Sequence, residues 1–127
     1  MKSAALCSVL FLLALPALAV DISGKWSGGF SLTSPDGNLS QEDVYMVVKV
    51  KGKEVTGTAG PSRDEQWLIQ KGKIEGDKIT FEVQDPNNVR LWKVQLVFMD
   101  GHLKGEAWAE VEGKKMGGKL DLQRQAD

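Results

Sequence analysis

The chain has almost no cysteine and almost no histidine. Its 127 residues contain one of each, Cys7 and His102. Disulfide frameworks and cysteine–histidine zinc sites need several such residues at set spacings, and neither C-x-x-C nor H-x-H occurs. The composition therefore excludes a disulfide-rich domain, and it gives no support to a thiol nucleophile or a zinc centre.

Motifs that carry catalysis are absent too. The sequence has no phosphate-binding loop and no G-x-S-x-G nucleophile motif. His102 follows Asp100-Gly101, so we expect it at a hairpin tip in solvent, without the nucleophile or partner base that catalysis requires. We predict that the protein is not an enzyme, and we expect no catalytic residue, no metal and no cofactor.

Long apolar runs are confined to the N-terminus. Residues 1–19 carry one lysine, a short apolar run and the ending A-L-A, which fits the cleavage pattern of a secretory signal peptide. The apolar run is too short to span a bilayer comfortably. We therefore expect residues 1–19 to be a cleaved signal peptide and residues 20–127 to form a single domain; an uncleaved anchor is the alternative.

Neither sign of charge dominates. The sequence has 16 basic and 17 acidic side chains, and removal of Lys2 with the signal peptide leaves 15 against 17, a net charge of −2. This balance argues against a nucleic-acid partner and against a membrane partner after signal cleavage. A mature chain without cysteine is unusual for a small extracellular eukaryotic domain. We expect a secreted or periplasmic bacterial protein.

What the sequence does contain is a repeated two-residue alternation. After residue 19 no segment shows the 3.6-residue apolar period of an amphipathic helix, whereas apolar residues recur at every second position. Trp26, Phe30 and Leu32, for example, share one face of a strand. The alternation predicts eight strands, at about 25–32, 41–51, 54–59, 65–75, 78–84, 89–99, 102–110 and 116–124.

The predicted connections alternate between tight and long. Gly52-Lys53, Gly76-Asp77 and Asp100-Gly101 are two-residue hairpin turns, because glycine accepts the positive φ that such turns need. In an up-and-down meander, alternate connections lie at opposite ends. Three tight hairpins should therefore close one end. Long loops should surround the other end, at 33–40, 60–64, 85–88 and about 111–115.

Eight antiparallel strands have two exposed edges unless the sheet closes on itself. We therefore predict an all-β fold, an eight-stranded antiparallel up-and-down β-barrel. Such a barrel is either filled by its own side chains or holds one small ligand. Inward glycines allow tight coiling of the strands or leave free space, and both explanations are open at this point. They are at positions 28, 57, 72, 105 and 118.

The G-K-W at 24–26 opens the first strand of this meander and resembles the G-x-W signature of the lipocalin and avidin-like barrels. The E-V-T-G-T at 54–58 resembles the avidin pattern in particular. The resemblance implies a ligand-binding barrel with Trp26 plugging its closed base. Because the polar side chains that surround biotin in avidins have no one-to-one match here, the resemblance identifies no ligand.

Arg124 has the same strand parity as the inward residues that precede it, and many lipocalins have a comparable arginine at the base. We expect its guanidinium over or beside Trp26, in a cation–π contact of about 0.5–2 kcal/mol. An exposed terminal arginine is the alternative.

A closed barrel with long loops at one end predicts a ligand site inside it. Apolar walls with a few polar rim groups suit a small amphipathic or hydrophobic ligand, so we predict a non-enzymatic binding protein. The predicted wall residues are Phe30, Met46, Val48, Phe81, Trp92, Val94 and Leu96. The predicted rim residues are Asp36, Arg63, Asp64, Asn87 and Asn88.

Two other functions remain open. A protein-binding barrel similar to secreted proteinase inhibitors would insert its N-terminal segment, Val20-Asp21-Ile22-Ser23, into a protease cleft. A structural module of the cell envelope would need no ligand. Carboxylates expected at the open end either bind Ca²⁺ or a cationic ligand or simply solvate the loops. They are Asp36, Asp64, Glu65 and Asp85.

By strand parity, Trp67 and Trp108 fall on the outer face. An outer apolar band that includes them would suggest a homo-oligomer or a partner surface. One alternative is a bulge at Lys71-Gly72 that shifts the register and turns Trp67 inward. The other is a flattened barrel with one covered wall.

Overall fold

The computed structural model describes residues 21–34, 36–87 and 89–125. The predicted signal peptide lies outside these residues. The described chain forms eight strands in sequence order. They are β1 (Gly24–Thr33), β2 (Leu39–Lys51), β3 (Glu54–Gly60), β4 (Trp67–Glu75), β5 (Lys78–Asp85), β6 (Arg90–Met99), β7 (His102–Val111) and β8 (Lys114–Arg124).

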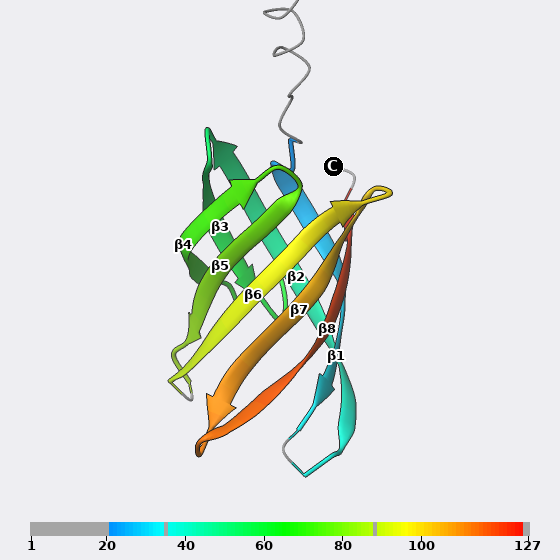
Figure 1. The fold of residues 1–127 in the computed structure, drawn as a ribbon, viewed down its shortest axis with the longest axis vertical. Coiled ribbons are helices and arrows are strands. Elements are labelled where there is room, and N and C mark those ends of the chain that lie inside the picture. Colours follow the sequence, from blue (N-terminus) through cyan, green and yellow to red (C-terminus); the bar gives the residue numbers. More distant parts are fainter. Residues whose placement is uncertain (1–20, 35, 88, 126–127) are drawn as a thin grey trace, which may run out of the picture.

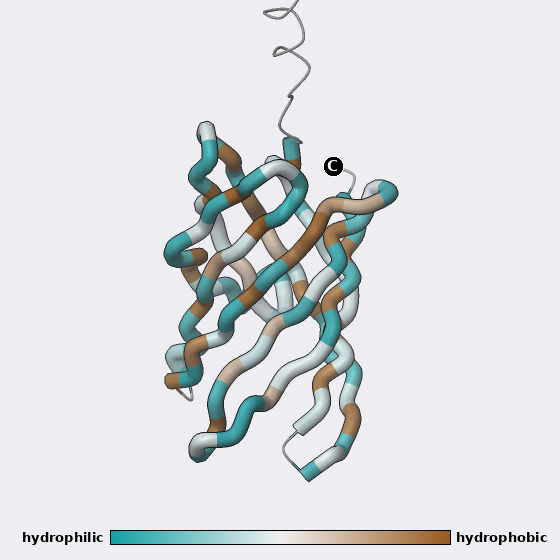
Figure 2. The backbone as a smooth tube through the Cα atoms, viewed as in Figure 1, coloured by the Kyte–Doolittle hydropathy of each residue, from teal (hydrophilic) through white to brown (hydrophobic). Residues whose placement is uncertain are grey.

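Each strand pairs antiparallel with the next, and β1 also pairs with β8, so the sheet closes into a barrel (Figure 1). The closing ladder runs from Trp26 opposite Arg124 to Thr33 opposite Gly117. Hydrophobic and hydrophilic residues alternate along the strands (Figure 2). The predicted fold, an eight-stranded up-and-down barrel, is confirmed.

No helix in the described ranges is long and apolar enough to cross a membrane.

The three predicted tight turns gather at one end of the barrel, which we call the base (Figure 1, top). Gly52 and Gly76 have φ of 64° at the first turn position. Asp100 and Gly101 have φ of 53° and 79°, the two consecutive positive values of a type I′ turn.

The prediction of a long loop near residues 111–115 is wrong. Glu112 and Gly113 have φ of 52° and 78°, and they form a two-residue turn between β7 and β8. A glycine in its second position lets this short turn match the twist of the two strands. The open end of the barrel, which we call the mouth, therefore carries three long connections and one tight hairpin.

A bulge in β4 reverses the faces of that strand. Its pairing with β5 shifts register between Gln70 and Lys73, and Lys71 has φ of 53°. Trp67 before the bulge and Ile74 after it both pack in the interior, although their numbers differ in parity. Leu68, which an unbroken strand would place on the same face as Ile74, is 71% exposed. The prediction that Trp67 lies on the outer face is therefore wrong, and the alternative of a bulge at Lys71-Gly72 is correct.

The inward glycines mark places where neighbouring strands come very close. A Cβ atom on Gly105 would lie 1.8 Å from the Gln95 carbonyl oxygen, and one on Gly118 would lie 1.7 Å from that of Ser31. Neither position has room for a side chain. These glycines therefore allow tight coiling of the barrel wall.

The base is densely filled. Six side chains near this end are fully buried: Ile22, Trp26, Ile79, Leu96, Leu103 and Leu122. The Trp26 indole donates a hydrogen bond from Nε1 to the Ile22 carbonyl at 2.9 Å, and its ring meets Phe98 edge to face at 6.3 Å. Trp26 thus has both an apolar packing site and a partner for its N–H group.

The predicted contact between Arg124 and Trp26 is present. The guanidinium carbon lies 4.5 Å from the centre of the Trp26 ring, while the other side of Arg124 remains open to solvent. Nη1 and Nη2 donate to the carbonyls of Ser23 and Asp21, at 2.7 and 2.9 Å. Arg124 therefore holds the segment before β1 across the base.

Candidate functional site

The half of the barrel nearest the mouth is hollow. A cavity of about 310 Å³ lies there, between the packed base and the mouth. Its apolar lining comes from strands all around the barrel. It comprises Phe30, Leu32, Val44, Met46, Ala59, Pro61, Trp67, Phe81, Val83, Trp92, Val94, Leu96, Ala107, Leu120 and Leu122.

Six of the seven predicted wall residues line this cavity. The exception is Val48, which is buried in the core but not in the lining, because it lies two inward positions closer to the base than Val44. Strand parity thus identified the correct face of each strand. It did not indicate how far the packed base extends from its end of the barrel towards the mouth.

The cavity wall is rich in aromatic rings. Phe30, Trp67, Phe81 and Trp92 contribute one ring each from β1, β4, β5 and β6. Phe30 and Trp92 meet edge to face, with ring centres 5.6 Å apart and planes at 84°. Aromatic pairs favour this arrangement, which leaves the remaining ring surface for other contacts. Sequence parity missed Trp67 because it placed this side chain outside.

None of the four predicted rim residues in the described ranges lines the cavity. Asp36 accepts hydrogen bonds within its own loop, from the Ser34 hydroxyl and, at 3.2 Å, from the Asn38 backbone N–H. These bonds, the one from Ser34 first, lower the pKa of the Asp36 carboxyl. Asp64 is exposed and outside the lining, and Asn88 lies outside the described residues.

Arg63 and Asn87 are also occupied outside the cavity. The Arg63 guanidinium lies 5.1 Å from the centre of the Tyr45 ring, on the outer face of β2. Asn87 donates from Nδ2 to Glu65 Oε2 at 3.0 Å, which joins the β5–β6 connection to the β3–β4 loop. The predictions failed here because loop contacts do not follow strand parity.

The charged groups in the lining are all acidic. The acidic residues of the lining are Glu42, Asp43, Glu65 and Asp85, and in the described part of the chain no basic residue joins them. The Asp43 side chain faces outward, because it alternates with the inward Glu42 and Val44. Glu42 lies opposite Phe30 in the β1–β2 ladder, and Asp85 continues the inward face of Val83. Asp85 also accepts the Asn87 backbone N–H at 2.8 Å. Of these four, we had predicted Glu65 and Asp85 at the mouth, but not Glu42 and Asp43.

The carboxylates at the mouth do not form a metal site. Over residues 21–34, 36–87 and 89–125, no three His, Cys, Asp or Glu side chains come close enough together to hold a metal ion. The alternative that carboxylates at the open end bind Ca²⁺ therefore has no geometric support in this part of the chain.

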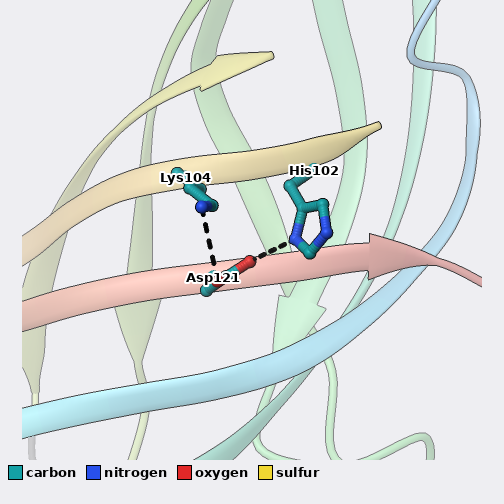
Figure 3. Close-up of polar contacts among 3 residues, drawn as sticks. All are labelled: His102, Lys104 and Asp121. Carbon is teal, nitrogen blue, oxygen red and sulfur yellow. Dashed lines mark hydrogen bonds and ion pairs between the residues drawn. The ribbon is translucent and has the colours of Figure 1, made fainter. Parts of the chain in front are cut away.

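His102 lies directly after the Asp100–Gly101 turn, as predicted, but on the outer wall near the base and only partly exposed to solvent. It is the first residue of β7 and its side chain is 30% exposed. Its Nδ1 atom lies 2.6 Å from Asp121 Oδ1, and Lys104 Nζ lies 4.0 Å from the other oxygen of the same carboxylate (Figure 3). Figure 3 shows the three side chains bridging β7 and β8. They lie on the outer face, because their positions alternate with the inward Leu103 and Leu122.

The predicted outer apolar band does not include Trp67, because this side chain lines the cavity. Trp108 does lie outside, beside Gly117 of β8, with Lys115 Nζ 4.9 Å from its ring centre. Exposed large apolar side chains elsewhere are scattered over several elements. They are Leu39, Leu68, Val89, Leu91 and Met99.

The segment considered as a protease-binding arm is part of the barrel. Ile22 is fully buried, and the Ser23 hydroxyl accepts a hydrogen bond from the Val50 N–H at 2.9 Å. Val20 lies outside the described residues. With Asp21 and Ser23 held by Arg124, residues 21–23 do not project from the barrel, so they cannot enter a cleft in this conformation.

These features define an eight-stranded up-and-down β-barrel with a packed base and an apolar cavity that opens at its mouth. No family model, no curated protein and no solved structure matches the chain. The assignment to this class of barrel rests on strand order, register and side-chain packing.

Proposed function

We propose that the protein is a non-enzymatic binding protein that holds a small amphipathic or hydrophobic ligand in the cavity at the mouth. The observation that carries this proposal is the contrast between the two halves of the interior. The half at the base is packed, whereas the half at the mouth holds an open cavity of about 310 Å³ next to the long loops. This volume is at the lower end of the roughly 300–1,000 Å³ typical of ligand pockets.

The side chains around the cavity support the same proposal. Ala59 and Ala107 occupy inward positions in its wall, where larger apolar residues would reduce the open volume. Apolar walls with a few polar groups at the entrance are the usual composition of a small-molecule pocket.

A relationship to the lipocalin and avidin-like barrels is part of the proposal. Its support is the G-K-W at the start of β1, with Trp26 buried in the base and Arg124 stacked on it. Secretion or export to a periplasm fits a binding protein of this kind, and the sequence of residues 1–19 supports it.

The proposal is tested by filling the cavity. Ala59→Phe places a ring inside, whereas Thr56→Phe places the same ring on the exposed outer face of the same strand. Binding of the neutral dye N-phenyl-1-naphthylamine is measured by its fluorescence, and circular dichroism checks that each variant is folded.

We expect the unmodified protein and Thr56→Phe to bind the dye equally, and Ala59→Phe to lose at least tenfold in affinity. Native mass spectrometry of the protein from its own host adds a second measurement, since a bound small molecule would appear as added mass. Absence of dye binding, or equal binding by a folded Ala59→Phe variant, would refute the proposal.

A further inference from the structure

We infer that the ligand is an organic cation, with an apolar body inside the cavity and its positive charge at the mouth. The inference rests on the proposed function and specifies the chemical class of the ligand. Two independent features of the lining carry it: the sign of its charged groups and its aromatic content.

The sign of the charge is the first feature. Four acidic residues belong to the lining, and no basic residue in the described ranges does. Asp43 alternates with the inward Glu42 and Val44, so its carboxylate faces outward and is not counted. The other three reach the mouth from different elements, since Glu42 belongs to β2, Glu65 to the β3–β4 loop and Asp85 to β5. Like charges around the mouth of a low-dielectric cavity attract the opposite ion and repel an anion such as a carboxylate.

The basic residues near the mouth are not part of the lining. Arg63 stacks on Tyr45 and Lys115 lies over Trp108, both on the outer wall. Arg90 is opposite Asp85 in the β5–β6 ladder, next to the lining. Within the described ranges the charged residues of the lining itself are thus all acidic.

The aromatic lining is the second feature. The rings of Phe30, Trp67, Phe81 and Trp92 belong to the same cavity as the carboxylates. Aromatic faces carry a negative electrostatic potential, and rings gathered around a site are a recurrent way to bind alkylammonium groups. An apolar wall of leucine and valine alone would hold a neutral chain equally well and would not favour a cation.

The volume limits the size of the ligand. About 310 Å³ equals the space of roughly ten water molecules at their liquid volume of about 30 Å³ each. A chain of about eight carbons with one charged group is of this order. Octylammonium, 1-octanol and octanoate are therefore suitable probes, because they share one apolar chain and differ in charge.

The first experiment compares the three probes by isothermal titration calorimetry at pH 7 and low ionic strength. We expect octylammonium to bind at least tenfold more tightly than octanoate, with 1-octanol in between. The preference should shrink at 0.5 M NaCl, because salt screens the charges at the mouth. Octanoate binding as tightly as octylammonium would overturn the inference and leave the proposed function standing.

The second experiment removes the charges. The triple variant Glu42→Gln, Glu65→Gln and Asp85→Asn neutralises three lining carboxylates while nearly preserving shape. A unit charge about 6 Å away contributes about threefold in affinity in a water-like dielectric, so three contribute up to about thirtyfold. We expect octylammonium to lose about tenfold to thirtyfold and 1-octanol to be unaffected.

The matched control also removes three acidic charges at the open end. Asp64→Asn, Glu110→Gln and Glu112→Gln change exposed residues outside the lining. This control should lose less than about threefold for octylammonium. Equal losses in the two triple variants, or no loss in either, would overturn the inference. If none of the three probes binds the unmodified protein, the proposed function itself fails.

Discussion

Arg124 lies over Trp26 across the ladder that joins the last strand to the first, with 4.5 Å between the guanidinium carbon and the ring centre. The same guanidinium donates to two carbonyls of the segment before β1. One side chain thus connects the plug of the base, the N-terminal segment and the closing pair of strands.

We predict that Arg124→Ala lowers the free energy of unfolding by about 1–2 kcal/mol, because it removes the cation–π contact and both hydrogen bonds at a partly exposed site. Arg124→Lys should recover only part of this, since an ammonium cannot place two N–H groups as the planar guanidinium does. Urea denaturation followed by tryptophan fluorescence measures both changes.

Arg63→Ala is the control for this prediction. Arg63 also lies over an aromatic ring, that of Tyr45, but on the outer wall away from the base. Its loss should cost no more than about 0.5–1 kcal/mol, because the exposed Arg63 gives up this one contact, whereas Arg124 also gives up two hydrogen bonds. If Arg124→Ala costs no more than Arg63→Ala, then Arg124 does not hold the base closed.

A second prediction concerns the close approach of β6 and β7. A methyl group on Gly105 would lie 1.8 Å from the Gln95 carbonyl oxygen, so the strands would have to separate. We expect Gly105→Ala to destabilise the protein by roughly 1–3 kcal/mol or to prevent folding, as overpacking does. Thermal unfolding by circular dichroism measures the change.

Gly29→Ala provides the comparison within the same barrel. The nearest atom to a Cβ at this position is the Glu42 carbonyl oxygen, 4.0 Å away, and Gly29 has no positive φ. This variant should be neutral or more stable by about 0.4–1 kcal/mol, because alanine restricts the unfolded chain. Similar losses at the two positions would mean that close strand contact is not the reason for glycine at 105.

A third prediction concerns how the free energy of unfolding changes at acid pH. The hydrogen bonds from Ser34 and Asn38 lower the pKa of Asp36 below its ordinary value of 3.8. A carboxyl whose pKa is lower in the folded state stabilises the fold above the unfolded-state pKa. That contribution is lost as the pH falls through the folded-state value. Asp36 should therefore titrate below pH 3.8 in a carboxyl-detected NMR experiment.

The variant Ser34→Ala identifies the cause of this shift. The Ser34 hydroxyl makes the largest contribution to the lowered pKa of Asp36, so its removal should move the midpoint upward towards the ordinary value. The Asn38 backbone N–H stays in place and should keep part of the shift. An unchanged midpoint would mean that the hydroxyl is not what stabilises the carboxylate.

The strand plan could be predicted from the sequence because it depends on local patterns. Side-chain alternation and glycine-containing turns placed all eight strands within a few residues of their observed bounds. The turn at Glu112–Gly113 was missed because a positive φ at glutamate has no strong sequence signal. By contrast, which side chains line the cavity and its mouth depends on contacts between segments that are distant in sequence.

Trp67 and the mouth illustrate that limit. Strand parity assumes an unbroken strand, so one bulge at Lys71 moved Trp67 from the outer face to the cavity wall. Glu42 faces inward, but a charged residue at an inward position is not recognisable as part of a mouth until the depth of the packed base is known. Asp36 and Arg63 have the polar character expected of a rim, yet their partners lie elsewhere.

The ladder between β1 and β8 also has a consequence for how this chain acquires its structure. Its partners, such as Trp26 and Arg124, stand near opposite ends of the barrel sequence, so this pairing has a very high sequence separation. Pairings of this kind slow folding, because the chain must close a long loop before the contacts form. During synthesis the edge of β1 that faces β8 stays unpaired until the last strand emerges, and other chains can capture that edge in the meantime.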